Sequence, residues 1–273
     1  MPIYPVQPFF LLNTTRYYKM RVPDSPIVHF YAYRADAAHV RSITAVPDGC
    51  VDILLSVRDG CAEGYAYGTV TQNTPLVVEA GCFYCGVRFR PGYMPAGLNL
   101  GIPELVNTRA PLDTLAGGSA LIERVAQCRD LAECVSAMRR FLGVGEAWRT
   151  GALLQQLIAL VERRRGDIRI ADLAEETGYS ARYIGRVFSD NLGLAPKSFA
   201  KFIRFQSTIG SLNAAGADGA EARSLTELAA ARGYYDQSHF IREFRDLAAV
   251  TPGEYVRAVD LPNYRRKIEY VTA

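Results

Sequence analysis

An internal repeat in the last third of the chain constrains the fold more than any other sequence feature. The stretch 173–179 (LAEETGY) aligns with 228–234 (LAAARGY) at an offset of about 55 residues. The matches farther along are 186–188 (RVF) with 242–244 (REF), and 195–199 (APKSF) with 251–255 (TPGEY), at an offset of about 56. Because similarity at a fixed period marks a repeated supersecondary unit, the sequence predicts two helical units, the second with one extra residue between its helices.

Both copies contain the residue types that a helix-turn-helix requires. A small residue stands where two helices cross, a glycine ends the first helix in the left-handed conformation, and a polar residue caps the second helix. These residues are Ala174, Gly178 and Ser180 in the first copy, and Ala229, Gly233 and Asp236 in the second. Pro196 and Pro252 suit the first turn of a following helix. A plain helical bundle with chance similarity is the alternative, and the agreement of two full copies disfavours it.

On these residues, about 151–257 resembles the DNA-binding domain of the AraC/XylS family of transcription regulators. The similarity is carried by 170–188 and 233–244, and 250–255 closes the match. Ala249 departs from the family, which usually has glycine there, and 214–223 is longer than usual. The resemblance implies a sequence-specific regulator of transcription that binds two adjacent major grooves of double-stranded DNA, with RNA polymerase as a candidate partner.

In such units the second helix enters the major groove with its N-terminal side chains at the base edges. The candidate base contacts are Ala181, Arg182, Gly185 and Arg186 on helix 180–191, and Gln237, Ser238, His239 and Arg242 on helix 236–246. Arg182 and Arg186 are four residues apart and share one helix face, where each suits guanine, a phosphate contact or a surface ion pair. Gln237 suits adenine.

A single long helix over 196–212 is expected between the two units. About 17 residues at roughly 1.5 Å each give roughly 25 Å, which can place two recognition helices near the roughly 34 Å repeat of DNA. Lys197, Lys201 and Arg204 on this helix are candidate phosphate contacts.

The front of the chain shows a different pattern, of short apolar runs ended by Gly and Pro. The runs 51–57, 76–78 and 83–89 predict a small β-barrel or β-sandwich. The segments 46–54, 86–92 and 101–105 resemble the β-rich N-terminal domain of one branch of these regulators. That resemblance implies a cupin-like barrel that binds a small effector or mediates dimerisation, so the expected fold class is α+β, a β-barrel followed by an all-α domain.

The expected domains are a regulatory domain over 1–115, a helical connector over 116–150, the DNA-binding domain over 151–260 and a C-terminal tail over 261–273. Residues 125–142 form an amphipathic stretch with two interpretations. They are a dimer helix, which would make the protein a homodimer, or they pack against their own barrel.

Candidate effector contacts are Tyr84, Arg88 and Arg90. The two arginines alternate with apolar residues, so a strand would place both on one side. Inside a barrel they could hold an anionic ligand, and outside it they are ordinary surface charges.

Other functions find little support. Cys82 and Cys85 form a C-x-x-C, but no second pair accompanies it, so two unrelated strand cysteines are favoured over a thiol or metal sensor. His29, His39 and His239 are the only histidines, in no metal-ligand spacing, which disfavours a cupin-like enzyme. The sequence predicts no catalytic residue, metal or cofactor.

The net charge of +3 is compatible with DNA but does not decide the function. No segment has the roughly 18 apolar residues of a membrane helix, and the N-terminus lacks signal-peptide features. We therefore expect a cytoplasmic protein without a membrane partner.

Overall fold

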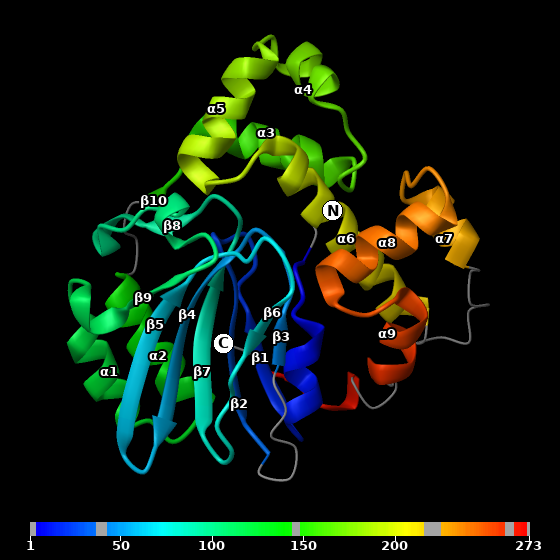
Figure 1. The fold of residues 1–273 in the computed structure, drawn as a ribbon. Coiled ribbons are helices and arrows are strands. Elements are labelled where there is room, and N and C mark those ends of the chain that lie inside the picture. The colour runs from blue at the N-terminus through cyan, green and yellow to red at the C-terminus, as the bar shows by residue number, and fades with distance from the viewer. Residues whose placement is uncertain (1–3, 37–42, 144–147, 216–224, 260–264, 272–273) are drawn as a thin grey trace.

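The computed structural model describes residues 4–36, 43–143, 148–215, 225–259 and 265–271. A β-sheet domain at the front of the chain is followed by a helical domain at the rear (Figure 1). The predicted order of a β-rich and an all-α part is thus confirmed. The finer expectation of a cupin-like barrel stays a prediction.

The front domain is built on a seven-stranded sheet with the strand order β11-β1-β2-β7-β4-β5-β9. Its strands are β1 (Tyr17–Arg21), β2 (Ile27–Arg34), β4 (Val51–Arg58), β5 (Cys61–Tyr67), β7 (Phe83–Phe89), β9 (Arg109–Pro111) and β11 (Ile268–Tyr270). Neighbouring strands are antiparallel except β1 and β11, which are parallel. Two short pairs accompany the sheet: β3 (Ile43–Ala45) with β6 (Thr74–Leu76), and β8 (Met94–Pro95) with β10 (Trp148–Arg149). Short 3-10 turns are η1 (Pro8–Asn13), η3 (Ala96–Leu98), η4 (Pro103–Leu105) and η5 (Leu112–Thr114).

The two faces of this sheet have different neighbours. Along β4, Ile53 and Leu55 are fully buried on the face that α1 (Gly118–Ala126) and α2 (Leu131–Leu142) cover. Leu54 and Ser56 alternate onto the opposite face, because successive strand residues point to opposite sides. That second face is lined by tyrosines and by the β3–β6 pair.

Helix α2 packs against the chain's own sheet, as in the second interpretation of residues 125–142, and the homodimer stays a prediction. Its apolar residues Leu131, Val135 and Met138 are buried in contact with the front domain. An apolar stripe that is already covered offers little to a second copy.

The rear domain consists of seven helices within the described residues: α3 (Ala152–Arg163), α4 (Ile170–Thr177), α5 (Ala181–Leu192), α6 (Pro196–Ala215), α7 (Leu225–Ala231), α8 (Gln237–Ala248) and α9 (Pro252–Val259). The long α6 joins the α4–α5 unit at the top of Figure 1 to the α7–α8 unit at its right. Across the described ranges, none of the helices is long and apolar enough to cross a membrane.

The two domains share a polar and an apolar contact at the middle of α6. The buried Gln206 side chain donates to the Pro47 carbonyl oxygen and accepts from the Val6 amide, both at 2.9 Å. About two helical turns earlier, the Phe199 ring lies so close to Gly49 that a Cβ atom on Gly49 would be 2.8 Å from it. A buried amide with both hydrogen bonds satisfied fixes α6 against the front domain.

Residues 268–270, which the sequence places in a tail, form the edge strand β11. It pairs with β1 through Tyr17 opposite Ile268 and Lys19 opposite Tyr270. Arg21 adds a hydrogen bond to the Tyr270 hydroxyl at 3.0 Å.

Candidate nucleic-acid interface

The first helix-turn-helix unit is formed by α4, a sharp turn and α5. Gly178 has φ +74°, and its amide donates to the Ala174 carbonyl oxygen at 2.9 Å. Ser180 then caps α5 by accepting from the Tyr183 amide at 3.2 Å. Both roles are those predicted from the sequence, because only a left-handed glycine and a short polar cap turn the chain this tightly.

The second unit repeats this arrangement with one extra residue. Gly233 has φ +70°, and the Asp236 carboxylate accepts from the His239 amide at 2.6 Å. Tyr235, which lies between them, is 93% exposed. The predicted insertion is therefore confirmed and is accommodated at the surface.

On α5, the predicted contact residues lie on an exposed face. Arg182 and Arg186 are exposed, whereas Ile184 and Phe188 on the opposite side are fully buried. Ala181 is exposed as well. Gly185 is half-buried, and a Cβ atom at this position would meet nothing within 4 Å.

Two tyrosines of this face were missed in the sequence. Tyr179 and Tyr183 stack with their ring centroids 5.2 Å apart, and the Arg186 guanidinium lies 5.1 Å from the Tyr183 centroid. Tyr183 lies three residues before Arg186 on the same side of α5, and this spacing could have revealed it, whereas Tyr179 lies in the turn before the helix.

On α8, Gln237, Ser238 and Arg242 are exposed and His239 is half-buried. The Gln237 side chain accepts from the Thr226 hydroxyl at 3.0 Å, and His239 lies 3.8 Å from the Glu243 carboxylate. The face that points away from α6 thus carries mostly neutral donors and one arginine.

Helix α6 carries the three predicted phosphate contacts in different settings. Lys197 is exposed and Lys201 is half-buried. Arg204 instead makes a bidentate ion pair with Glu243 of α8, at 2.8 and 3.0 Å, and its side chain is only 17% exposed. Its guanidinium is therefore committed to holding α8 on α6.

Aromatic contacts fix both recognition helices on α6. Phe188 of α5 packs on Phe199 with centroids 5.5 Å apart, and Phe244 of α8 packs on Phe205 at 5.1 Å. Helix α6 has 20 residues and therefore spans about 30 Å. The two units are thus positioned by one rigid element.

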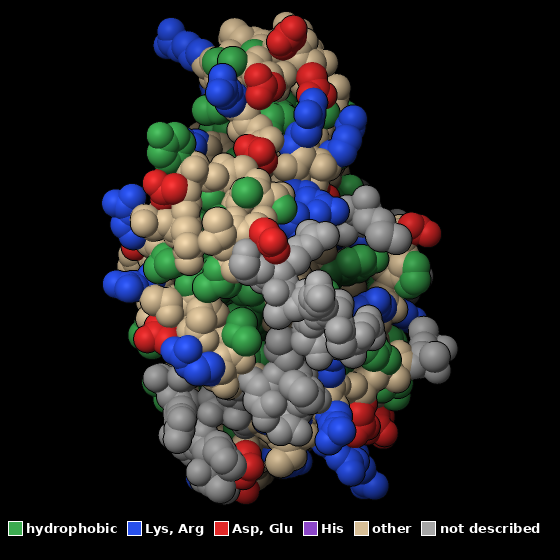
Figure 2. All heavy atoms as spheres, turned by 90° about the vertical axis from the view of Figure 1, so that its right-hand side faces the viewer, with side chains coloured by type: hydrophobic (Ala, Val, Ile, Leu, Met, Phe, Trp, Pro, Cys, Tyr) green, Lys and Arg blue, Asp and Glu red, His purple; other side chains and the backbone are tan. Residues whose placement is uncertain are grey.

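The charge around the second unit is mixed. On the side of the molecule that carries α7 and α8, Lys and Arg side chains lie scattered among Asp and Glu side chains (Figure 2). An interface of this kind depends on a few local contacts more than on a broad positive field.

The predicted effector residues are not brought together, because β7 ends at Phe89. Arg88 is buried and pairs with Asp48 at 3.0 Å and Asp52 at 2.8 Å. Burial opposes its charge, but the two carboxylates outweigh burial and hold the pKa of Arg88 well above its usual value. Arg90 lies beyond the strand and donates to the Ser25 carbonyl oxygen at 2.8 Å.

Tyr84 alone of these three lines a large cavity of the front domain. Its hydroxyl accepts from the Glu79 amide at 2.9 Å, and burial raises the pKa of Tyr84 to about 12. It is a neutral hydrogen-bonding group at neutral pH.

The cysteines and histidines form no site within the described residues. Cys82 lines the cavity and donates to the Val57 carbonyl oxygen, whereas Cys85 lies on the other side of the sheet beside Cys134. Burial lowers the pKa of His29 well below its usual value. His39 lies outside the described residues, and no three metal-ligating side chains cluster in the described ranges.

Comparison with known proteins agrees with this geometry. A family model described as a helix-turn-helix domain matches residues 173–258, and a domain family of unknown function (DUF6597) matches residues 25–111. A curated relative from Haemophilus influenzae, an uncharacterized HTH-type transcriptional regulator, is 28% identical over 105 residues, which are 38% of this chain. The match spans about a third (33%) of that relative's length.

Two solved structures illustrate the range of similarity. A probable AraC family transcriptional regulator from Rhodopseudomonas palustris is 29% identical, with 40% of this chain and 98% of that chain covered and a TM-score of 0.35. ToxT K231A from Vibrio cholerae is 11% identical over 88% of this chain and 100% of that chain, with a TM-score of 0.45. With the tandem units and the two matched family models, residues 173–258 are identified as a helix-turn-helix domain and residues 25–111 as a DUF6597 domain.

Proposed function

We propose that this protein is a sequence-specific DNA-binding regulator of transcription, controlled by a small effector in its front domain and acting in the cytoplasm. The observation that carries the proposal is the attachment of two recognition helices, α5 and α8, to the single helix α6. An element of about 30 Å can present both helices to successive major grooves, which repeat at roughly 34 Å.

Each recognition helix has its own part in binding. Arg182 and Arg186 of α5, with the exposed Ala181 and the small Gly185, contact bases in one groove. Gln237, Ser238, His239 and Arg242 of α8 contact bases in the next groove. Arginine suits guanine and glutamine suits adenine, because each can form two hydrogen bonds with that base.

Lys197 and Lys201 contact phosphates, which add affinity and a salt dependence without sequence information. RNA polymerase and a second copy of the chain are further candidate partners. A dimer would use a surface other than the buried stripe of α2.

A DNase footprint on the region upstream of the protein's own gene tests this proposal. We expect protection over about two helical turns per chain, lost in the double variant Arg186→Ala, Arg242→Ala. The control is Arg124→Ala, Arg140→Ala, which removes the same charge from exposed positions of α1 and α2. Equal loss in both double variants would contradict the proposal.

A further inference from the structure

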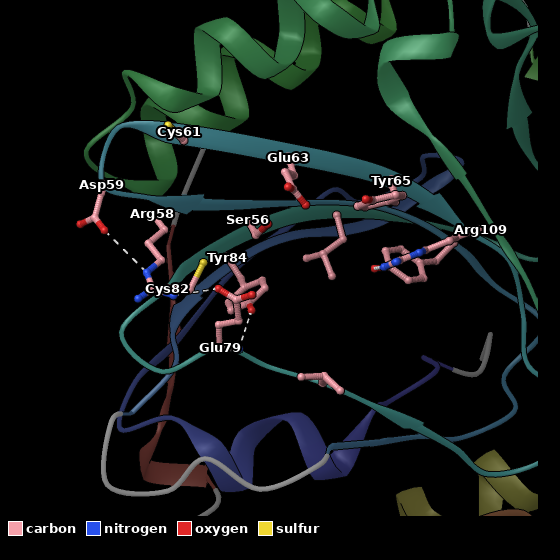
Figure 3. A pocket seen from close by; sticks show the side chains of 13 residues that line it. Ser56, Arg58, Asp59, Cys61, Glu63, Tyr65, Glu79, Cys82, Tyr84 and Arg109 are labelled. Carbon is pink, nitrogen blue, oxygen red and sulfur yellow. Dashed lines mark hydrogen bonds and ion pairs between the residues drawn. The ribbon is translucent and has the colours of Figure 1, made fainter.

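A trough runs along the tyrosine-rich face of the front sheet, opposite α1 and α2. It consists of two adjoining cavities of about 520 and 470 Å³, which share Leu54, Tyr67, Val77, Tyr84 and Arg109 in their walls. Figure 3 shows Tyr65 and Arg109 at one end of it, and Arg58, Asp59 and Cys82 at the other. Volumes of this size are typical of sites for small organic molecules.

Stacked aromatic rings form the floor of the trough. Tyr33 and Tyr84 stack at 5.1 Å, and Phe10 meets the Tyr33 ring edge-on at 6.3 Å. The hydroxyl of Tyr33 is buried and has no hydrogen-bond partner among the described residues. Burial also raises the pKa of Tyr33 well above its usual value, so the hydroxyl keeps its proton. Tyr33 therefore contributes an uncharged aromatic ring to the floor.

The charges of the trough are neutralised at one end only. Arg58 pairs with Glu79 at 3.1 Å and with Asp59 at 3.6 Å. Arg109 donates to the Tyr67 hydroxyl at 2.8 Å, lies 4.0 Å from the Tyr65 ring centroid, and has no ion pair with any carboxylate of the described ranges. Glu63 also lines the trough and interacts electrostatically with Arg109, although no ion pair joins the two within the described residues.

We propose that this trough binds a small carboxylic acid with an apolar body, as the effector site of the proposed regulator. The carboxylate pairs with Arg109, whose guanidinium is held in place by two tyrosines. The apolar body lies over Leu54 and the stacked rings. This inference rests on the proposed function and adds the ligand class and the residues that recognise it.

The same loops that line the trough hold both recognition helices. Residues 68–78 and 107–109 line the second cavity, and Asn107 and Thr71 join these loops by side-chain hydrogen bonds at 3.0 and 3.1 Å. Asn73, within the first loop, donates to the Asp246 carbonyl oxygen of α8 at 3.0 Å.

The first recognition helix rests on the neighbouring turn. At the end of α5, a Cβ atom on Gly193 would lie 2.8 Å from Val106 and 2.9 Å from Pro103, which shows how closely η4 approaches. An occupied trough therefore acts on α5 and α8 together, and binding of acid and of DNA must influence each other by the same factor.

Calorimetric titration of the full chain tests the ligand class, with 3-phenylpropionate, octanoate and the neutral 3-phenylpropionamide as probes. We expect at least one acid to bind, 3-phenylpropionate at least tenfold more tightly than its amide, and Arg109→Gln to abolish that difference. Arg109→Lys should retain part of it, which separates loss of charge from loss of folding. The control Arg124→Gln, on the far side of the sheet, should change nothing.

Equal binding of acid and amide, or no binding of either acid at millimolar concentration, would overturn the inference. The footprint without acid is read separately, so protection of DNA combined with no acid binding defeats only the inference. Acid binding without any footprint, whether the acid is present or absent, defeats the proposed function instead.

The coupling is tested by titrating 3-phenylpropionate with and without the footprinted DNA. We expect DNA to change the acid affinity severalfold, and Asn73→Ala to reduce that change. The neighbouring Gln72→Ala, at an exposed side chain, is the matched control. An acid affinity that is the same with and without DNA in the wild type would overturn the coupling.

Discussion

The two helix-turn-helix units share their geometry but not the contacts that stabilise it. Both recognition helices have 12 residues, a preceding left-handed glycine and a polar cap. In the first unit the ion pair is Arg164 with Glu176, whose side chains are 60% and 33% exposed. In the second it is Arg204 with Glu243, at 17% and 8%. The same helix-turn-helix backbone is therefore stabilised by an exposed ion pair in the first unit and by a mostly buried one in the second. Removing the ion pair should lower the free energy of unfolding by different amounts in the two units.

The largest expected contrast lies in these ion pairs. Glu243→Gln leaves the Arg204 guanidinium half-buried without a counter-charge and should lower the free energy of unfolding by about 2–4 kcal/mol. Glu176→Gln should lower it by no more than about 1 kcal/mol, because solvent screens the exposed pair. Urea unfolding of the two variants measures both values, and similar losses would remove the distinction between the units.

The two units should contribute separately to DNA binding. Arg186→Ala and Arg242→Ala should each weaken binding by about 1–3 kcal/mol and relax specificity in one half of the site. Lys197→Ala should weaken binding to all sequences alike and reduce the salt dependence by about one phosphate contact. Titrations over a salt series, with each half-site mutated in turn, give both quantities. If both arginine variants lost specificity in the same half of the DNA site, the assignment of one groove to each helix would be refuted.

The ends of the recognition helices should respond in opposite directions. The residue after α5 is Gly193, with φ +66°, and the residue after α8 is Ala249, with φ +63°. Gly193→Ala should destabilise by about 1–2 kcal/mol, because it adds strain and a contact with η4. Ala249→Gly should stabilise by about 0.5–1 kcal/mol. Thermal unfolding measures the signs, and two shifts of equal sign would show that strain is not the deciding factor.

The smallest contrast concerns the exposed tyrosines. Tyr235→Ala should change the free energy of unfolding by less than about 0.5 kcal/mol, since the side chain is 93% exposed. Tyr183→Ala loses its stacking on Tyr179 and should cost about 0.5–1.5 kcal/mol. Both are accessible by the same urea titrations. A larger loss at Tyr235 would mean that the inserted residue packs in solution.

Local signals predicted the rear domain well. Gly178, Gly233, Ser180 and Asp236 take the predicted positions because helix ends are decided by a few neighbouring residues. The pairing of Arg204 with Glu243 was out of reach, since it joins residues far apart in the chain and nothing nearby in the sequence marks it.

The front domain was predictable in class but not in its site. Strand alternation correctly predicts the two faces of β4. It wrongly places Arg88 and Arg90 on one side of a strand, since β7 ends at Phe89 and this end is set by tertiary pairing, which the local sequence does not encode. The importance of Arg109 depends on the distance to Tyr65 and Tyr67 of a neighbouring strand, and no periodicity encodes it. The order of the sheet, with first and last strands side by side, is likewise a property of the folded chain.

That last pairing has a mechanical consequence. Strand β10 precedes the rear helices and pairs with β8, and strand β11 follows them and pairs with β1. Both ends of the helical domain are therefore attached to the front domain. A domain on one tether can swing through a wide cone, whereas one with two anchors is restricted to rotation about the line that joins them. The contacts of Gln206 and Phe199 with the front domain oppose that remaining rotation, so the two anchors and α6 together hold the helical domain in one orientation.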